Sequence, residues 1–441
     1  MTDASSYFDL SPTDRSMAVL ERTSSVTFHV VWDMIGPVDF DALLGAWGAL
    51  ARVHPILACT TDIDISAVWQ PGLEPSAIEV IEGGTDVDGA TAQATAAPLQ
   101  IASGPIVRLT AIKGTMGLRL ILAAQHAAFD GAASVVMIED LRRMYLGRVS
   151  GDSAPVEPDF SPRTVRSALQ QMRLPMATAQ GFITQSLDRW RKLPPSGHVD
   201  PAATPSEIAT GYVTIDVGPA LDSLDQKRRR NSWPTDAVLI GLLETAWNEV
   251  LGAADGAGIW LVAANLRPGL GLDRGSGNLS GVEPIAMKDN RPHSVDASIE
   301  QAAARIAATK AGFPGLGPEL MARSWAWTTP SLMNQGVDTM IRSGRRQRYT
   351  RILSNMGRLP DSLTDWGPAR LAGLRYLGPM AQGPYCMFVA QAQGGNSWLT
   401  VRTSPDWFSV DHAKEFERVI NRYCGVDQEH LVPAQVVSSD R

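Results

Sequence analysis

The chain has 441 residues, of which 44% are hydrophobic and 19% are charged. This balance is typical of a globular protein with a large core, and it excludes a disordered tail, a collagen-like chain and a small disulfide scaffold. The formal net charge of −7 argues against binding nucleic acid through the overall electrostatic field. At about 100–200 residues per domain, the length allows two or three domains or one two-lobed unit.

The first half of the chain alternates predicted strands and helices. Asp39 is expected to cap a helix that ends near His54, because the residue before a proline disfavours helical geometry. A long predicted helix lies in a proline-rich linker. The expected elements are strands 26–34 and 57–62, a hairpin of strands 106–113 and 118–125, and helices 40–53, 134–146 and 164–190.

A second mixed region begins at Tyr212. Its apolar runs and turn residues predict strands and helices in a proportion similar to that of the first half. The expected elements are helices 237–251 and 411–423, and strands 212–217, 258–265, 351–355, 371–376, 386–393 and 397–403. The glycine-rich stretch 269–281 is predicted to be a loop.

The segment most informative about function reads Gln-His-Ala-Ala-Phe-Asp-Gly from Gln125 to Gly131. It lies between a predicted buried strand and a predicted helix, so that the imidazole of His126 can project from the strand end into a cleft. An imidazole exchanges a proton readily near neutral pH. Asp130 could orient the ring or hold the turn through an arginine. From these residues alone, a histidine near a strand end is more often structural than functional.

This segment resembles the HHxxxDG motif of the condensation-domain superfamily. The superfamily includes peptide-synthetase condensation domains, chloramphenicol acetyltransferase, polyketide-associated acyltransferases and wax-ester synthases, and its plant-type members carry HxxxDG. Further similar pieces follow in the family's order. They are the "LSPxQ"-like start at 10–14, the "HPxL" helix exit at 54–57, "PL" and "GPIVR" at 98–108, "NLRP" at 265–268, "GN" at 277–278, "SNMGR" at 354–358 and "DWG" at 365–367.

The resemblance implies a mixed α/β (α+β) fold. Two lobes, each similar to a chloramphenicol acetyltransferase subunit, would form a V-shaped pseudo-dimer with a central tunnel. We expect an N-terminal lobe over residues 1–185 that carries the HxxxDG motif, and a C-terminal lobe with bridging loops over residues 186–441.

The resemblance also implies roles for single residues. His126 matches the catalytic histidine, and Gly131 matches a motif glycine whose N–H is a candidate donor to a developing oxyanion. Asp130, grouped with the catalytic motif, matches an aspartate that pairs with the arginine corresponding to Arg267. The expected substrate-binding residues are Gln125, Ser354, Asn355 and Trp366, and the expected structural residues are Arg267, Asp365 and Gly367.

Two departures from the family pattern leave alternatives open. Gln125 replaces the first motif histidine, and Ala132-Ala133 follows the motif where many condensation domains have a Trp-Ser pair. The leading hypothesis is an acyltransferase that forms an amide or ester from an acyl thioester and an amine or hydroxyl, with His126 as general base, in specialised metabolism. The alternatives are a non-catalytic module that binds carrier proteins, or a different reaction such as cyclisation.

The expected co-substrate is acyl-coenzyme A or a phosphopantetheinyl acyl or peptidyl carrier protein, and the acceptor is a small amine or alcohol. We expect no bound cofactor, no metal, no membrane span and a cytoplasmic location.

An acidic carrier would need a local basic surface, and two clusters offer one. They are 227–230 and the arginines at 342, 345, 346, 348 and 351. Trp325 and Trp327 could line a substrate pocket, although core packing is the more common role of tryptophan.

Overall fold

The fold is taken from a computed structural model of the chain. It describes residues 8–21, 25–66, 68–73, 76–115, 117–152, 158–193, 211–252, 258–272, 274–287, 294–310, 312–323, 331–332, 335–336, 339, 351–379, 386–403, 408–426 and 435–437. The predicted pocket residues Trp325 and Trp327 and the arginines at 342, 345, 346 and 348 lie outside these ranges.

The first lobe is built on a six-stranded sheet in the order β11-β12-β1-β6-β5-β4. The predicted hairpin is present, with β5 and β6 antiparallel. Strand β1 lies at the centre between β12 and β6, and six of its nine residues form one unbroken buried run. The strands are β1 (Thr27–Ile35), β4 (Glu79–Gly84), β5 (Val107–Gly114), β6 (Leu118–Gln125), β11 (Asp365–Trp366) and β12 (Ala369–Leu377).

Helices cover both faces of this sheet. α2 (Phe40–Val53) packs beside α4 (Gly131–Ser150), and α3 (Val87–Ala96) lies against the opposite face, where Ala92 and Ile121 belong to one buried cluster. Asp39 caps α2 as predicted, since its Oδ1 accepts a hydrogen bond from the backbone N–H of Ala42 at 2.9 Å. The predicted strand 57–62 is only the two-residue β2 (Cys59–Thr60), because a 3₁₀ turn, η2 (Pro55–Ala58), occupies its first part.

The second lobe repeats the plan with a seven-stranded sheet in the order β15-β7-β14-β13-β10-β8-β9. Its core includes Trp247, Trp260 and Phe388, whose rings pack together between α8 and the sheet. The strands are β7 (Gly211–Asp216), β8 (Gly258–Asn265), β9 (Ser280–Met287), β10 (Arg351–Arg358), β13 (Cys386–Gln393), β14 (Asn396–Thr403) and β15 (Gln435–Val437). The helices are α7 (Gly218–Asn231), α8 (Thr235–Val250), α9 (Val295–Lys310) and α12 (Val410–Tyr423).

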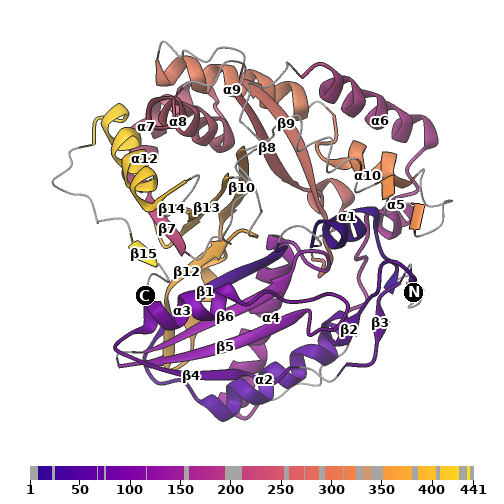
Figure 1. The fold of residues 1–441 in the computed structure, drawn as a ribbon, viewed down its shortest axis with the longest axis vertical. Coiled ribbons are helices and arrows are strands. Elements are labelled where there is room, and N and C mark those ends of the chain that lie inside the picture. The colour runs from indigo at the N-terminus through magenta and orange to yellow at the C-terminus, as the bar shows by residue number, and fades with distance from the viewer. Residues whose placement is uncertain are drawn as a thin grey trace.

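The two sheets and their helices form two lobes that meet along one side (Figure 1), as the mixed α/β, two-lobed prediction requires. The division at residue 185 does not hold for every strand. β11 and β12 come from the C-terminal half, but they hydrogen-bond into the sheet of the first lobe, where β12 pairs with β1. In Figure 1 the orange β12 therefore lies among indigo and purple strands.

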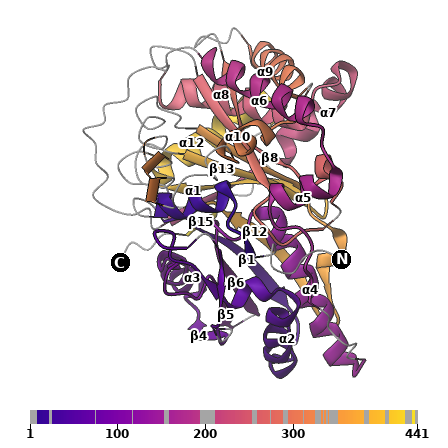
Figure 2. The same ribbon diagram turned by 90° about the vertical axis from the view of Figure 1, so that its right-hand side faces the viewer.

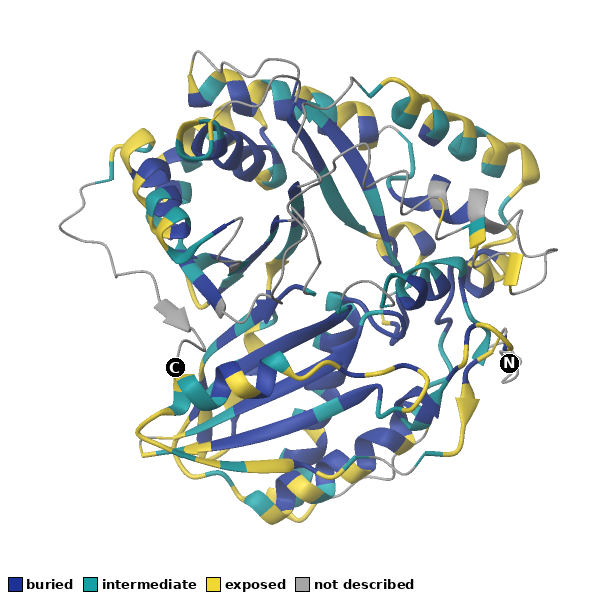
Figure 3. Cartoon of the chain, in the orientation of Figure 1, coloured by how far each residue is buried: buried dark blue, intermediate teal, exposed yellow. Residues whose placement is uncertain are grey.

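The linker holds two helices instead of one long helix. α5 (Val165–Met172) ends at Arg173, whose φ is 52°, and α6 (Met176–Arg191) begins after Pro175. A proline at that place cannot continue the hydrogen bonding of α5. α6 runs along the outside of the second lobe with much of its surface exposed (Figure 3).

Additional contacts join the lobes near the N-terminus. α1 (Pro12–Glu21) contacts α10 (Leu316–Arg323) of the second lobe (Figure 2), and the Thr13 hydroxyl donates a hydrogen bond to Glu319. None of the helices in the described part of the chain combines the length and apolar character needed to cross a bilayer.

Candidate active site at the junction of the lobes

His126 is the first residue after β6 and lies five positions before the start of α4. The sheet still holds its backbone, because its N–H donates to the carbonyl of Val26 at 3.0 Å. A tight turn follows, in which the N–H groups of Ala128 and Phe129 both donate to the carbonyl of Gln125, at 2.9 and 3.2 Å. The strand end and the turn together fix the main chain on both sides of the half-buried histidine.

The His126 ring lies in a largely apolar setting. Phe28 contacts it edge-on, with the ring centroids 5.6 Å apart and the planes at 72°. Burial lowers the pKa of His126 below its usual value of 6.5, and the backbone groups of His126 and Phe129 and the charge of Asp130 offset this only in part. Nδ1 is buried and has no well-aligned hydrogen-bond partner among the described residues. The ring is therefore a neutral imidazole at neutral pH, which is the form that accepts a proton.

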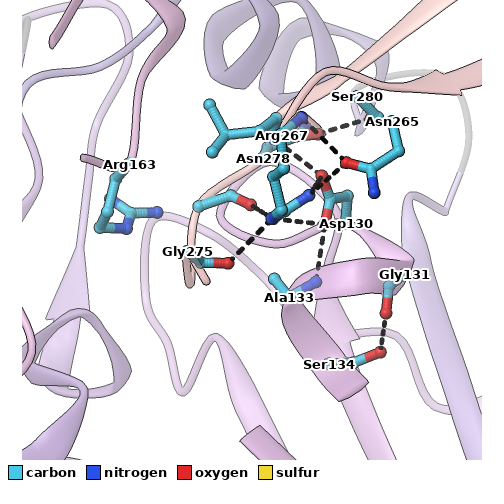
Figure 4. A network of polar contacts seen from close by, with 12 residues as sticks. Asp130, Gly131, Ala133, Ser134, Arg163, Asn265, Arg267, Gly275, Asn278 and Ser280 are labelled. Carbon is cyan, nitrogen blue, oxygen red and sulfur yellow. Dashed lines mark hydrogen bonds and ion pairs between the residues drawn. The ribbon is translucent and has the colours of Figure 1, made fainter. Parts of the chain in front are cut away.

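Asp130 joins the two lobes (Figure 4). Its carboxylate makes two parallel contacts with the guanidinium of Arg267, with Oδ2 2.8 Å from Nη1 and Oδ1 2.9 Å from Nη2. Both side chains are about 5% exposed. The same carboxylate caps α4 by accepting from the N–H of Ala133 at 2.8 Å, and it accepts from the N–H of Leu279 at 2.7 Å. The ion pair that the resemblance implies is thus present.

Arg267 is held equally well from its own side. Nη2 donates to the carbonyls of Gly275 and Gly277, at 2.9 and 2.8 Å, and Nη1 donates to Oδ1 of Asn265 at 3.3 Å. A bidentate pair whose remaining donors are satisfied recovers much of the cost of burying two charges.

Asn278 connects the second lobe directly to the histidine. Its Nδ2 donates to the backbone carbonyl of His126 at 2.7 Å, and its Oδ1 accepts from the Ser280 hydroxyl at 2.8 Å. Sequence reasoning identified Asn278 only as part of a "GN" pair. Its role was missed because its partner lies 152 positions away in the chain.

The first turn of α4 packs closely against the second lobe at Gly131. A Cβ at this position would lie 2.6 Å from the sulfur of Met356, so any side chain there would displace Met356. The carbonyl of Gly131 accepts from the Ser134 hydroxyl at 2.6 Å, and Ser134 in turn lies 3.2 Å from the Tyr376 hydroxyl. Gly131 is also the first residue of α4. The backbone N–H groups in the first turn of a helix have no acceptor within that helix.

The amide nitrogen of Gln125 is bonded within the protein core, which argues against the predicted role of this residue in substrate binding. Its side chain is completely buried, and Nε2 donates to Oε1 of Glu21 at 2.7 Å and to the carbonyl of Leu99 at 3.0 Å. It holds α1 and the segment at Leu99 against the end of β6. Burial is also the main cause of the raised pKa of Glu21.

Trp366 is likewise a core residue and not a pocket wall. It is 1% exposed, its ring lies 5.6 Å from that of Tyr145, and its Nε1–H donates to the carbonyl of Leu363 at 2.9 Å. Asp365 and Gly367 form the turn between β11 and β12, where Oδ1 of Asp365 accepts from the N–H of Gly367 at 2.9 Å. Gly367 has φ of 72°, a conformation that favours glycine.

Ser354 and Asn355 lie on β10, and both are half-buried. Nδ2 of Asn355 donates to Oδ1 of Asp236, at the start of α8, at 2.6 Å. Asn355 also lines a cavity of about 470 Å³ in the second lobe, which Asn265 and Asp236 line as well. Asn355 is therefore placed beside a space that could hold a ligand.

A second hollow of about 500 Å³ contains Asp140, Arg143 and Arg274. Asp140 is paired there with Arg274, at 2.8 Å, and with the buried His54, at 2.9 Å. His126 lines neither of these two cavities, and the central tunnel remains a prediction. Among the described residues, no group of three or more His, Cys, Asp or Glu side chains could hold a metal ion.

Most cations in the described parts of the two basic clusters form ion pairs. Arg351 is 5% exposed, forms an ion pair with Glu244 and lies over the ring of Trp247, so its predicted place in a docking surface is wrong. In the run 227–230, three of the four cations are paired. Lys227 contacts Asp296, while Arg228 and Arg229 both contact Asp225.

Known proteins share both the fold and part of the sequence. The structure of polyketide synthase associated protein 5 from Mycobacterium tuberculosis matches 96% of this chain and 99% of its own, with a TM-score of 0.64 and 16% identity. The first condensation domain of the calcium-dependent antibiotic synthetase, solved with a substrate analogue, matches 97% of this chain and 99% of its own, with a TM-score of 0.70 and 13% identity. The fold is therefore that of condensation domains, as the motif order predicts.

The sequence matches are more limited. Phthiocerol/phthiodiolone dimycocerosyl transferase of Mycobacterium tuberculosis is 28% identical over 166 residues, which is 37% of this chain. The match spans 38% of that protein's own length. No family model matches the chain. The sequence similarity therefore covers only a part of each protein.

The buried pair yields a prediction about stability. Replacing Arg267 by Met leaves the Asp130 carboxylate buried without its partner, a change that typically costs about 3–5 kcal/mol. We expect chemical unfolding, followed by tryptophan fluorescence, to shift to clearly lower denaturant. Arg267→Lys keeps the charge but loses the fork geometry, so its shift should be intermediate.

Arg229→Met is the matched control, because it removes an arginine from an ion pair at the surface, where the side chain is 75% exposed. Its unfolding midpoint should stay close to that of the wild type. An Arg267→Met protein with the midpoint of the wild type would contradict the role given to the pair.

Proposed function

We propose that the protein is an acyltransferase that moves an acyl group from a thioester to an amine or a hydroxyl, with His126 as the general base. The observation that carries the proposal is a half-buried imidazole with a lowered pKa on a residue whose backbone is held by hydrogen bonds to both lobes. The names of the related proteins support the same class, since one is a transferase and the other a condensation domain.

In this mechanism the neutral imidazole accepts the proton of the amine or hydroxyl while that group attacks the thioester carbonyl. The tetrahedral intermediate then collapses as the carbon–sulfur bond breaks. The imidazolium returns the proton to the leaving thiolate, so a free thiol and an amide or ester are the products. The reaction needs no acyl-enzyme and no redox partner, and holding the two substrates together supplies much of the rate.

The backbone N–H at Gly131 is the proposed donor to the oxyanion. Asp130 determines where this N–H lies, because the same carboxylate caps α4 and pairs with Arg267. Asp130 is thus a positioning residue in the proposal, and it does not act as an acid or base. A donor fixed in advance at the developing charge stabilises the transition state more than one that must reorient.

The acyl donor in this proposal is a thioester of coenzyme A or of a phosphopantetheinyl carrier protein. Two carboxylates, Asp296 and Asp225, offset part of the positive charge that the run 227–230 could offer a carrier protein. Both donors therefore belong in the first assay, with small amines and alcohols as acceptors. A module that only binds carrier proteins would need no base of lowered pKa. It would also need no hydrogen bonds that hold this base from both lobes, so the site favours catalysis.

The direct test is His126→Ala against a panel of acyl thioesters on both carriers, with product detected by intact mass. General-base catalysis contributes about 10²–10⁴-fold, so we expect a loss of at least about a hundredfold in turnover. The control is His412→Gln, which alters a half-buried histidine in the capping box of α12, a helix of the second lobe. Full turnover by His126→Ala would exclude His126 as the base.

Asn278→Ala tests the contact from the second lobe separately. Losing the hydrogen bond to the His126 carbonyl removes about 0.5–1.5 kcal/mol, so we expect kcat to fall by about two- to tenfold. KM should change little, because the side chain holds the histidine and not the substrate. A rise in KM with unchanged kcat would instead place Asn278 among the substrate contacts.

A further inference from the structure

The cavity of about 470 Å³ in the second lobe has a size suited to a small-molecule ligand. It lies between the sheet and α9 at the carboxyl ends of β8 and β10, two neighbouring parallel strands. Ligands of open α/β sheets bind at such strand ends. Asn265 and Asn355, near the ends of the two strands, contribute to its wall.

Four consecutive residues of β8, Val262 to Asn265, line this cavity. Trp260 points toward α8, where its ring meets that of Trp247, and alternation along the strand then places Val262 and Ala264 on the same face. Ile285 lies opposite Trp260 on β9 and belongs to this face too. The small side chain of Ala264 leaves room that a larger residue would fill.

The wall opposite the strands contains two large apolar side chains beside Thr309 and Lys310. Ile306 of α9 is 5% exposed and reaches the cavity from the helix side. Phe313 is fixed in place, because its ring packs on Gly269, where a Cβ would come within 2.2 Å of it, and meets Phe182 edge-on at 5.7 Å. The Phe313 ring is therefore held by Gly269 on one side and by Phe182 on the other.

Most polar side chains of the inner wall already have partners, while Lys310 lines the cavity from the exposed end of α9. Glu283 accepts two hydrogen bonds from Arg189, at 2.8 and 2.9 Å, and one from the N–H of Gly315 at 2.8 Å. Thr309 donates to the carbonyl of Arg305 at 3.0 Å. Asp236 is bonded to Asn355. A polar ligand would find few unused partners there, whereas a hydrocarbon needs none.

A series of hydrogen bonds links the wall of the cavity to the candidate active site. Asn265 lines the cavity, and its Oδ1 accepts from the backbone N–H of Arg267 at 3.1 Å, next to the Asp130 pair. Asn265 also faces Ser280 across the strands, and Ser280 bonds to Asn278, which holds His126. In Figure 4 the amide nitrogen of Asn265 points away from this network.

We infer that this cavity holds the hydrocarbon chain of the acyl group, and that Ala264 limits the length of that chain. The inference rests on the proposed function for the reaction itself. A chain lying here would extend from the active site past Asn265 into the apolar space between β8 and α9. The acceptor would then approach His126 from outside this lobe.

The first test is binding, which requires no turnover. The fluorescent fatty acid cis-parinaric acid should bind the wild-type protein saturably. Ala264→Leu and Ala264→Phe fill the cavity and should weaken binding progressively, by about tenfold or more for Phe, since each methylene in an apolar pocket has a strong effect. The control is Ala308→Phe, which adds the same bulk to an exposed position on α9 and should bind as the wild type does.

The second test is chain-length preference, with acetyl, octanoyl and dodecanoyl thioesters and one fixed acceptor. We expect Ala264→Leu to retain acetyl transfer and to lose dodecanoyl transfer, with thermal unfolding close to that of the wild type. If Ala264→Phe fails to fold, the Leu variant decides the question.

The outcomes separate this inference from the proposed function. Unchanged fatty-acid binding in a folded Ala264→Leu protein, or equal losses for all chain lengths, would overturn the acyl-chain assignment even if His126 proves to be the base. A raised KM for the acceptor with an unchanged length profile would assign the cavity to the acceptor. Weakened binding in the variants together with full turnover by His126→Ala would instead overturn the proposed mechanism and leave the cavity assignment in place.

Discussion

The buried contact between Asp130 and Arg267 is the interaction on which the rest of the site depends. One carboxylate caps α4 in the first lobe, pairs with an arginine of the second lobe and accepts a backbone N–H from Leu279. Because His126 lies only four residues earlier in the same turn, the relative position of the lobes and the position of the imidazole are set together. The chain works as one unit for this reason, although each lobe has its own sheet and core. The strand β12, which enters the sheet of the first lobe from the C-terminal half, joins the lobes a second time.

The site combines rigid polar contacts with apolar surroundings, and each has its own effect. Phe28 and the buried setting lower the pKa of His126, so that the ring remains neutral and can accept a proton. The hydrogen bonds from Asn278 and to Val26 hold the backbone on either side of that ring. The second-lobe cavity shows a similar division, since Asp236, Asn355 and Glu283 have hydrogen-bond partners and apolar side chains lie beside them. A base without strong partners in an apolar setting suits transfer of an acyl group from a thioester.

Local signals predicted the parts of the fold in which apolar periodicity and caps agree. The hairpin of β5 and β6, the strand β8 and the helix α8 lie where the pattern placed them, and the order of the motifs predicted the two-lobed fold. α3 was missed because Val87–Ala96 is mostly small and polar and carries a glycine, so it has no apolar stripe, and tertiary contacts decide its structure. Gln125, Trp366 and Arg351 were given surface or ligand roles, but each is buried with a specific partner. Those partners are Glu21, the carbonyl of Leu363 and Glu244. In particular, Glu21 and Glu244 lie more than a hundred positions away in the chain, where no local pattern can indicate them.

The central claim is that His126 is held as a neutral base by its buried setting, and an NMR titration of the imidazole tests it most directly. The chain has seven histidines, so selective labelling of histidine rings and comparison with His126→Gln would assign the resonance. The account predicts a single His126 titration with its midpoint below the usual value of 6.5. A midpoint above that value would show that the protein stabilises the imidazolium, and it would contradict the assignment of His126 as the base at neutral pH.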